Sequence, residues 1–280
     1  GTNTITITNV VRGEVWLASG QSNMRFPVER ATNSSADIAA ANFPQNRMFT
    51  AAFAVKGEPQ DDVKGKWEVC TPETVKAFSA VGFFFGREIH KARKVPVGII
   101  HASCDWTPGE AWMPREALVS DPELKYMADR WDGITSAYPG AKKEYDSKMA
   151  EWQKEADKAK VEGKAAPGQP KGPADPNFIH RASGLWNGTV APFISYAIRG
   201  VIWYQGETNE VRGYQYRKLF AALIKSWRQK WGQGDFPFLF VQISSVLPPD
   251  PEPVESEWAE LRESQTLTLA LPMTVPCAAA

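Results

Sequence analysis

The sequence predicts an α/β protein built on a doubly wound, mostly parallel sheet. Short apolar segments recur along the chain, and each ends in a polar or small residue, as strands buried on both faces of a sheet do. Stretches of helical periodicity separate these segments. Such an alternation is typical of a doubly wound sheet, in which ligands bind beyond the carboxyl ends of the strands.

The expected elements follow one another along the chain. Residues 4–8 alternate β-branched apolar and polar side chains, which predicts a strand with one buried face. Residues 14–18 form the first continuous apolar segment and lead into Ser19 and Gly20. Further buried strands are expected at 95–101, 199–205 and 236–243, and helices at about 78–93 and 213–230.

Residues 121–176 interrupt this alternation with a segment rich in Lys, Glu, Asp and Ala, which we expect to be a helical insertion. Its aromatic residues recur at intervals of seven: Trp131, Tyr138, Tyr145 and Trp152. This spacing predicts a helical hairpin, and residues 163–173 predict a Pro/Gly-rich loop. Because the two charge signs are interspersed, we expect a solvated face, with a lid or a partner surface as the alternative.

Composition and charge exclude several classes of function. The 280 residues, 43% of them hydrophobic, are expected to form one domain over residues 1–280. The 32 Lys and Arg balance the 32 Asp and Glu, so no net charge would attract nucleic acid or an anionic membrane. No apolar run approaches the roughly 20 residues of a membrane-spanning helix. Three cysteines without a Cys-x-x-Cys spacing exclude a disulfide-stapled scaffold and a Cys-rich zinc site.

The chain contains 11 Trp residues, which is many for its length. Indole rings stack well on the C–H faces of sugars, so carbohydrate is a candidate ligand. Large rings that fill the core are the alternative, and only their positions can decide between the two.

Ser22 is the first candidate for chemistry. It follows the first buried strand and therefore lies at the carboxyl edge of the sheet, where a nucleophile would be exposed. The surrounding residues do not form a Gly-x-Ser-x-Gly elbow, because Met24 stands in place of the second glycine. A serine in such a turn could equally cap the next helix.

Residues 203–209 offer a second set of polar groups at the same edge. Gln205, Glu207 and Asn209 follow a buried strand, and Gly206 permits close approach of the backbone. A carboxylate with two amides could supply an orienting acid and an oxyanion hole. A polar turn that caps the next helix is the alternative.

These two segments resemble the sialate O-acetylesterase family of SGNH hydrolases, which are carbohydrate esterases with a flavodoxin-like three-layer α/β/α fold. The resemblance is carried by Gly-Gln-Ser-Asn-Met at 20–24 and Trp-Tyr-Gln-Gly-Glu-Thr-Asn at 203–209, and it extends to residues 9–17, 109–113 and 185–192. It implies a periplasmic or extracellular serine carboxylesterase that removes O-acetyl groups from sugars without a metal or cofactor. An acetylxylan-type esterase and an inactive carbohydrate-binding protein on the same fold remain the alternatives.

The resemblance also assigns roles to single residues. Ser22 would be the nucleophile, and its backbone N–H together with the Asn209 side chain would stabilise the oxyanion. Gln21 and Gln205 would line the substrate pocket. Glu207 would either orient a catalytic histidine or serve a structural role.

One departure from the family pattern concerns the turn at residues 103–107. The family usually carries Ser-Trp-Gly-Gly-Thr there, whereas this chain reads Ser-Cys-Asp-Trp-Thr. We expect a backbone N–H of Asp105 or Trp106 to donate to the oxyanion, provided that Trp106 avoids a positive φ and the Asp105 carboxylate is turned away or paired. The rings of Trp106 and Trp112 are expected to flank the pocket. Cys104 lacks an evident base and is expected to be a small core residue.

The second departure concerns the base. The family's Asp-x-x-His motif does not occur within these 280 residues, and His90, His101 and His180 are expected to play structural or substrate-contact roles. From this we expect a chain that hydrolyses simple esters feebly. Because members of the family commonly carry a β-rich region before the strand expected near residues 2–8, we also expect the chain to be incomplete at both ends.

Overall fold

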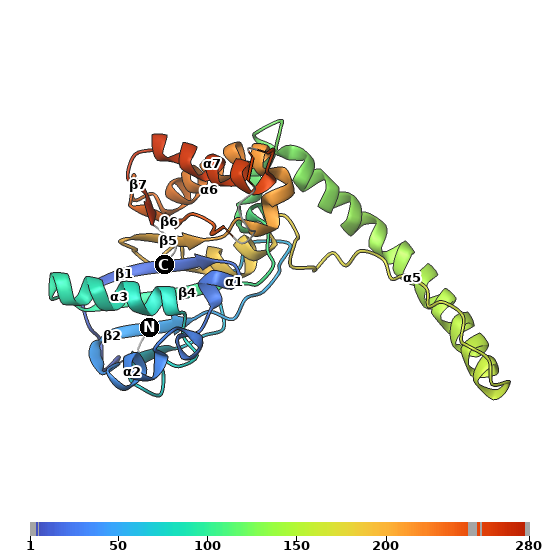
Figure 1. Ribbon diagram of the computed structural model, residues 1–280, viewed down its shortest axis with the longest axis horizontal. Coiled ribbons are helices and arrows are strands. Elements are labelled where there is room, and N and C mark those ends of the chain that lie inside the picture. The colour runs from blue at the N-terminus through green and yellow to red at the C-terminus, as the bar shows by residue number, and fades with distance from the viewer. Residues whose placement is uncertain (1–3, 5, 246–250, 253, 278–280) are drawn as a thin grey trace.

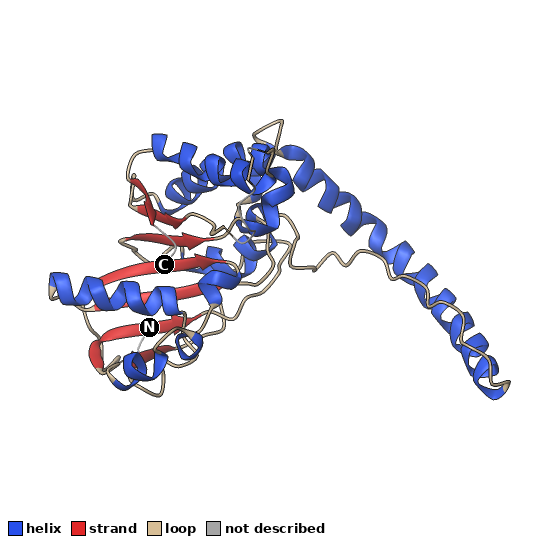
Figure 2. Ribbon diagram, viewed as in Figure 1, coloured by secondary structure: helices blue, strands red, loops and turns tan. Residues whose placement is uncertain are grey.

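A seven-stranded sheet forms the centre of the computed structural model, which describes residues 4, 6–245, 251–252 and 254–277. The strands are β1 (Glu14–Gly20), β2 (Phe43–Thr50), β3 (Trp67–Cys70), β4 (Val97–Ser103), β5 (Gly200–Tyr204), β6 (Phe238–Val241) and β7 (Thr274–Cys277). Their order is β3-β2-β4-β1-β5-β6-β7, and neighbours are parallel except for β2 and β3. The predicted fold class and the four predicted buried strands are confirmed (Figure 2).

Helices cover both faces of this sheet (Figure 1). They are α1 (Ser22–Arg25), α2 (Ser34–Ala39), α3 (Ala80–Arg93), α4 (Arg115–Val119), α5 (Lys125–Val161), α6 (Gly213–Trp231) and α7 (Glu257–Leu267). Short helical turns occupy η1 (Val28–Arg30), η2 (Gly109–Trp112), η3 (Trp186–Val190), η4 (Ala191–Phe193), η5 (Glu207–Arg212) and η6 (Thr268–Ala270). The helices expected at 78–93 and 213–230 are α3 and α6.

Alternate residues of the strands build two separate cores, as expected for a three-layer α/β/α arrangement. Trp16 and Ala18 of β1 belong to the core beneath α3, where they join Phe83. Leu17, which lies between them in sequence, belongs to the core beneath α6 together with Trp227. Because successive side chains of a strand point to opposite faces, a continuous apolar segment supplies both cores.

The strand order brings the site's segments together. β1 lies between β4 and β5, so the turns that follow these three strands meet at one edge of the sheet. The turn after β1 requires glycine: Gly20 has φ +141°, and a Cβ atom there would lie 2.1 Å from the Tyr204 carbonyl oxygen. The close approach of β1 and β5 therefore fixes where the next two residues, Gln21 and Ser22, are placed.

The insertion differs from the expected hairpin. It contains a single 37-residue helix, α5, which is about 55 Å long at 1.5 Å per residue and extends away from the sheet (Figure 1). The Pro/Gly-rich residues return alongside it without helical structure, and Trp152 Nε1 donates to the Pro167 carbonyl oxygen at 2.8 Å. Residues 163–173 contain three prolines and three glycines, and this density disfavours a second helix, whereas α5 accommodates a single proline, Pro139.

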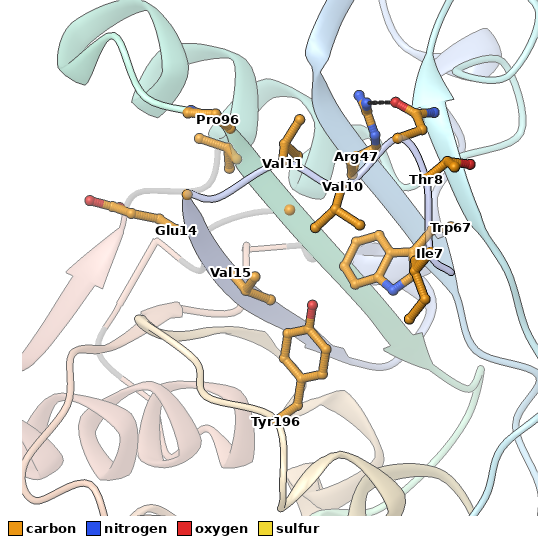
Figure 3. A pocket seen from close by; sticks show the side chains of 14 residues that line it. Ile7, Thr8, Val10, Val11, Glu14, Val15, Arg47, Trp67, Pro96 and Tyr196 are labelled. Carbon is orange, nitrogen blue, oxygen red and sulfur yellow. Dashed lines mark hydrogen bonds between the residues drawn. The ribbon is translucent and has the colours of Figure 1, made fainter. Parts of the chain in front are cut away.

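The strand expected at residues 4–8 is also absent from the described part of that segment. Residues 4 and 6–8 pair with no strand, and Ile7 and Thr8 instead line a cavity at the amino-terminal edge of β1, β2 and β4 (Figure 3). Arg47 donates to the Asn9 side chain at 2.8 Å and holds this crossing segment. Alternation predicts an extended backbone, but a strand also needs a free sheet edge beside it.

Candidate active site

A cavity of about 580 Å³ opens at the carboxyl edge of the sheet. The turn after β1 contributes one wall, η5 after β5 contributes the opposite wall, and Trp106 from the turn after β4 closes a third side. The lining residues are Gln21, Ser22, Asn23, Trp106, His180, Glu207, Thr208, Glu210, Val211 and Trp258. Ser22 and Glu207 therefore share one cavity, as the strand positions predict.

Ser22 is placed as an exposed nucleophile would be. It is the first residue of α1, and Gln21 rather than Ser22 occupies the capping position. Its hydroxyl forms no hydrogen bond with any described residue, so its oxygen is free at the cavity wall. The backbone N–H of a first helical residue has no partner inside its helix and can donate to a bound anion. The alternative of a capping serine does not fit this placement.

Glu207 is bound through one oxygen and unpaired at the other. Asn23 Nδ2 donates to Glu207 Oε1 at 2.7 Å, whereas Oε2 is buried and has no hydrogen-bond partner among the described residues. Burial raises the pKa of the Glu207 carboxyl above its ordinary value. η5 leads into α6, whose capping residue is Arg212 without a side-chain cap, so Glu207 does not cap that helix.

Asn209 lies behind the cavity rather than in its wall, and this corrects the expectation of a side-chain oxyanion donor. It is 1% exposed, and its Nδ2 donates to the carboxylate of Glu110 at 3.0 Å. Its Oδ1 accepts from the Gly109 backbone and from Gln205 Nε2. A buried amide saturates its hydrogen bonds locally, and here the nearest acceptor for Nδ2 is a charged one.

Gln205 takes part in the same network and is also not part of the cavity wall. It is fully buried, its Nε2 donates to the Thr107 carbonyl oxygen at 3.1 Å, and the Tyr216 hydroxyl donates to its Oε1 at 2.7 Å. The expected contact of Gln205 with substrate is therefore wrong. Gln21 does line the cavity, and its Oε1 accepts from the Gly206 N–H at 3.4 Å.

The turn at Asp105 and Trp106 was expected to supply an oxyanion donor if the Asp105 carboxylate is paired or turned away and if the φ of Trp106 is not positive. The structure meets the first condition and not the second. The Asp105 carboxylate is paired with Arg25 at 3.3 Å, so it is turned toward a cation. Trp106, however, adopts φ +59°, the left-handed conformation that glycine would adopt at lower cost. His180 Nε2 lies 2.6 Å from the Trp106 carbonyl oxygen. Because a carbonyl oxygen can only accept a hydrogen bond, His180 Nε2 is the protonated donor.

The two tryptophans expected at the pocket have different environments. Trp106 is 73% exposed and lines the cavity, as expected. Trp112 is fully buried, so its predicted sugar contact is wrong. Its indole N–H donates to Thr107 at 3.0 Å, and its ring packs edge-on against Trp203 with centroids 6.1 Å apart. Most of the energetic value of such a ring comes from core packing.

The remaining candidate nucleophile and bases lie outside the cavity wall. Burial raises the pKa of the Cys104 thiol to about 11, which keeps it protonated. Burial, with a smaller contribution from Arg25, lowers the pKa of His101 to about 4, and its Nε2 lies 2.7 Å from Ser103 Oγ. His90 is bonded to the Val95 carbonyl oxygen at the end of α3. His180 is thus the histidine that the described residues bring to the cavity.

Two contributors were not anticipated from the sequence. Trp258 of α7 lines the cavity, and its Nε1 donates to the Ser244 carbonyl oxygen at 2.6 Å. Glu110, buried to 6% exposure, anchors Asn209 and Arg212 behind the cavity. Within the described ranges, no group of three His, Cys, Asp or Glu side chains is arranged to hold a metal ion. The same ranges contain no helix long and apolar enough to cross a membrane.

The chain has clear relatives among known proteins. Residues 171–280 match the family model described as carbohydrate esterase, sialic acid-specific acetylesterase. The chain is similar to the sialate O-acetylesterases of Rattus norvegicus, with 30% identity over 274 residues, and of Homo sapiens, with 27% identity over 261 residues. Both alignments cover 87% of this chain but only 45% and 42% of the relatives, so the chain spans less than half the length of the curated relatives it matches.

A solved structure has the same architecture. The crystal structure of a carbohydrate acetylesterase from Xanthomonas citri superposes with a TM-score of 0.71 at 30% identity. The match covers 95% of this chain and 49% of that chain.

Proposed function

The chain belongs to the sialate O-acetylesterase family of SGNH hydrolases, and we propose that it is a serine carboxylesterase that removes O-acetyl groups from acetylated sugars. The observation that carries the proposal is that Ser22, whose hydroxyl is bonded to no described residue, and Glu207 line one cavity from opposite walls. A polar group without a partner in the wall of a cavity is typical of a site that its substrate completes.

The reaction would proceed through an acyl-enzyme. Ser22 Oγ attacks the acetyl carbonyl carbon and gives up its proton, and the sugar leaves as an alcohol that takes up a proton. Water then attacks the acetyl-serine, which releases acetate and restores the hydroxyl. The backbone N–H of Ser22 is our candidate for stabilising the oxyanion of each tetrahedral intermediate. Trp106 does not meet the condition set for it, because its φ is positive.

Glu207 is our candidate for the group that receives the Ser22 proton. Its raised pKa makes it a stronger base than an exposed carboxylate, and its Oε2 has no hydrogen-bond partner in the described part of the chain. A carboxylate remains a weaker base than imidazole, so we expect a low rate on simple esters. His180 is instead assigned to positioning, because its Nε2 is engaged by the Trp106 turn.

The test of this function is acetate release from O-acetylated sugars by the purified 280-residue chain. Release that Ser22→Ala abolishes is expected. A chain that binds acetylated sugars but releases no acetate would support the carbohydrate-binding alternative instead. Parallel assays on 9-O-acetylated sialic acid and on acetylated xylo-oligosaccharides would separate the sialate esterase from the acetylxylan-type esterase. A periplasmic or extracellular location is part of the same proposal.

A further inference from the structure

A second cavity adjoins the Ser22 cavity beside the amino-terminal turns of α5. It has a volume of about 680 Å³, within the range of small-molecule sites. The first turns of α5, the segment that returns alongside α5, the turn after β4 and η5 form its walls. His180 and Thr208 line both cavities and so form the boundary between them. The two cavities are therefore direct neighbours, with these two side chains between them.

Three aromatic side chains line this second cavity. Tyr126 and Phe178 are about half exposed, at 46% and 48%, and Trp131 is half-buried. The Tyr126 hydroxyl donates to Gln215 at 2.8 Å, and the Phe178 ring packs on His180 with centroids 4.6 Å apart, so each ring has a contact that helps to orient it. Fixed aromatic faces of this kind suit the apolar C–H faces of a pyranose ring.

The charges that line the cavity cancel. Arg212 Nη2 donates to the buried carboxylate of Glu110 at 2.7 Å, which forms one neutral pair. Arg130 and Asp175 contribute one further charge of each sign. Because the lining has no net charge, it exerts no overall attraction on an ionised ligand, whereas its donors and acceptors can both bind hydroxyl groups.

We propose that this cavity binds an uncharged pyranose unit linked to the acetylated sugar, so that the protein prefers acetylated oligosaccharides to acetylated monosaccharides. The proposal rests on the proposed function only in taking an acetylated sugar as the occupant of the Ser22 cavity. It concerns binding rather than turnover, and can therefore be tested without ester hydrolysis.

The experiment measures binding by calorimetry to the Ser22→Ala chain, which cannot form an acyl-enzyme. Two ligand pairs are compared: 9-O-acetyl-N-acetylneuraminic acid with 9-O-acetylated sialyllactose, and acetylated xylose with acetylated xylotetraose. We expect the oligosaccharide of at least one pair to bind about 10-fold more tightly than its monosaccharide, as one or two stacked rings would give. Tyr126→Ala and Phe178→Ala should each reduce this preference while leaving monosaccharide affinity unchanged.

The matched control is Trp152→Ala, which removes an aromatic ring from the same helix outside the cavity and should leave the preference intact. Equal affinities within both pairs, or a preference that both cavity variants retain, would overturn the proposal. The second unit can also be varied. An acetylated oligosaccharide whose second unit is a uronic acid should not bind more tightly than one whose second unit is uncharged, and tighter binding would overturn the assignment to an uncharged unit. The native chain, which keeps Ser22, is assayed for acetate release in parallel. If the oligosaccharide binds more tightly than the monosaccharide but the native chain releases no acetate, the proposed esterase activity is refuted and the proposed sugar site is not.

Discussion

Glu207 Oε1 accepts a hydrogen bond from Asn23 Nδ2 at 2.7 Å across 184 positions of sequence. This contact ties the turn after β1, which carries Ser22, to the turn after β5. The second oxygen of the same carboxylate has no partner among the described residues. This one side chain therefore links two walls of the cavity that Ser22 lines.

Glu207→Gln should lower the rate of ester hydrolysis and raise stability. The amide keeps an oxygen for Asn23 but accepts no proton, so we expect kcat to fall about 10²-fold. Because burial raises the folded-state pKa, the ionised carboxylate destabilises the fold once the pH rises through that pKa. The variant should therefore melt at a higher temperature than the native chain at neutral pH.

Below the unfolded-state pKa of about 4.3, both states of the native chain are protonated and the difference in melting temperature should vanish. Glu210→Gln is the matched control for the activity assay, since it changes another glutamate of the same cavity. The charge of Glu210 also raises the pKa of Glu207, so the melting temperatures are compared only between Glu207→Gln and the native chain. A stability gain without loss of activity would make Glu207 a structural group only.

Gly20→Ala should disrupt the turn that places Ser22. The substitution combines a strained φ of +141° with a Cβ 2.1 Å from the Tyr204 carbonyl oxygen, so we expect a loss of about 3 kcal/mol or more in the free energy of unfolding. Gly232→Ala is the control, because its φ is +62° and nothing lies within 4 Å; it should cost about 1 kcal/mol. Denaturant titration measures both, and equal losses would show that the β1–β5 contact is not the constraint.

The sequence predicted β1, β4, β5 and β6 because their residues are largely buried on both faces. The inner strand β2 was not predicted, because polar residues interrupt its apolar ones. Leu17, Ile100 and Val201 each face one core while their neighbours face the other, which produces a continuous apolar run. The edge strands β3 and β7 could not be recognised, because four residues of mixed polarity carry no periodicity. The aromatic spacing predicted the helix that the structure shows as α5. The same spacing does not reveal that the Pro/Gly-rich residues that return alongside α5 form no second helix.

The site was predictable in place but not in the direction of its side chains. Strand ends located Ser22 and Glu207 at one edge. Asn209 and Trp112 lie close to that edge, yet both side chains turn inward, toward Glu110 and Trp203. A pattern of residue types shows which turn a residue occupies, whereas the buried partner that draws its side chain inward comes from a distant part of the chain.

His180→Gln should preserve most of the activity that His180→Ala loses. We expect the alanine variant to lower kcat/KM about 10-fold by releasing the Trp106 turn, and glutamine to restore it because its amide N–H can donate to the same carbonyl oxygen. A general base would behave otherwise. If glutamine were as inactive as alanine, and both matched Ser22→Ala, His180 would be the base and its positioning role would be wrong.

Trp106→Gly should stabilise the fold and weaken sugar binding. Glycine adopts the observed φ of +59° without strain, which we expect to add about 0.5–1 kcal/mol to the free energy of unfolding. Loss of the exposed ring should raise the Kd for an acetylated sugar several-fold. Trp106→Ala separates the two effects, since it removes the ring but keeps the strain. Unchanged binding in both variants would exclude Trp106 from the sugar contact.

Covalent labelling shows whether Ser22 is a nucleophile, because a fluorophosphonate reacts with a serine only when its hydroxyl is activated. The measurement is the intact mass of the chain after incubation with the probe, followed by peptide mapping. We expect one adduct per chain, located on Ser22, absent from Ser22→Ala and slowed in Glu207→Gln. No adduct, or an adduct that persists in Ser22→Ala, would show that Ser22 is not an activated nucleophile.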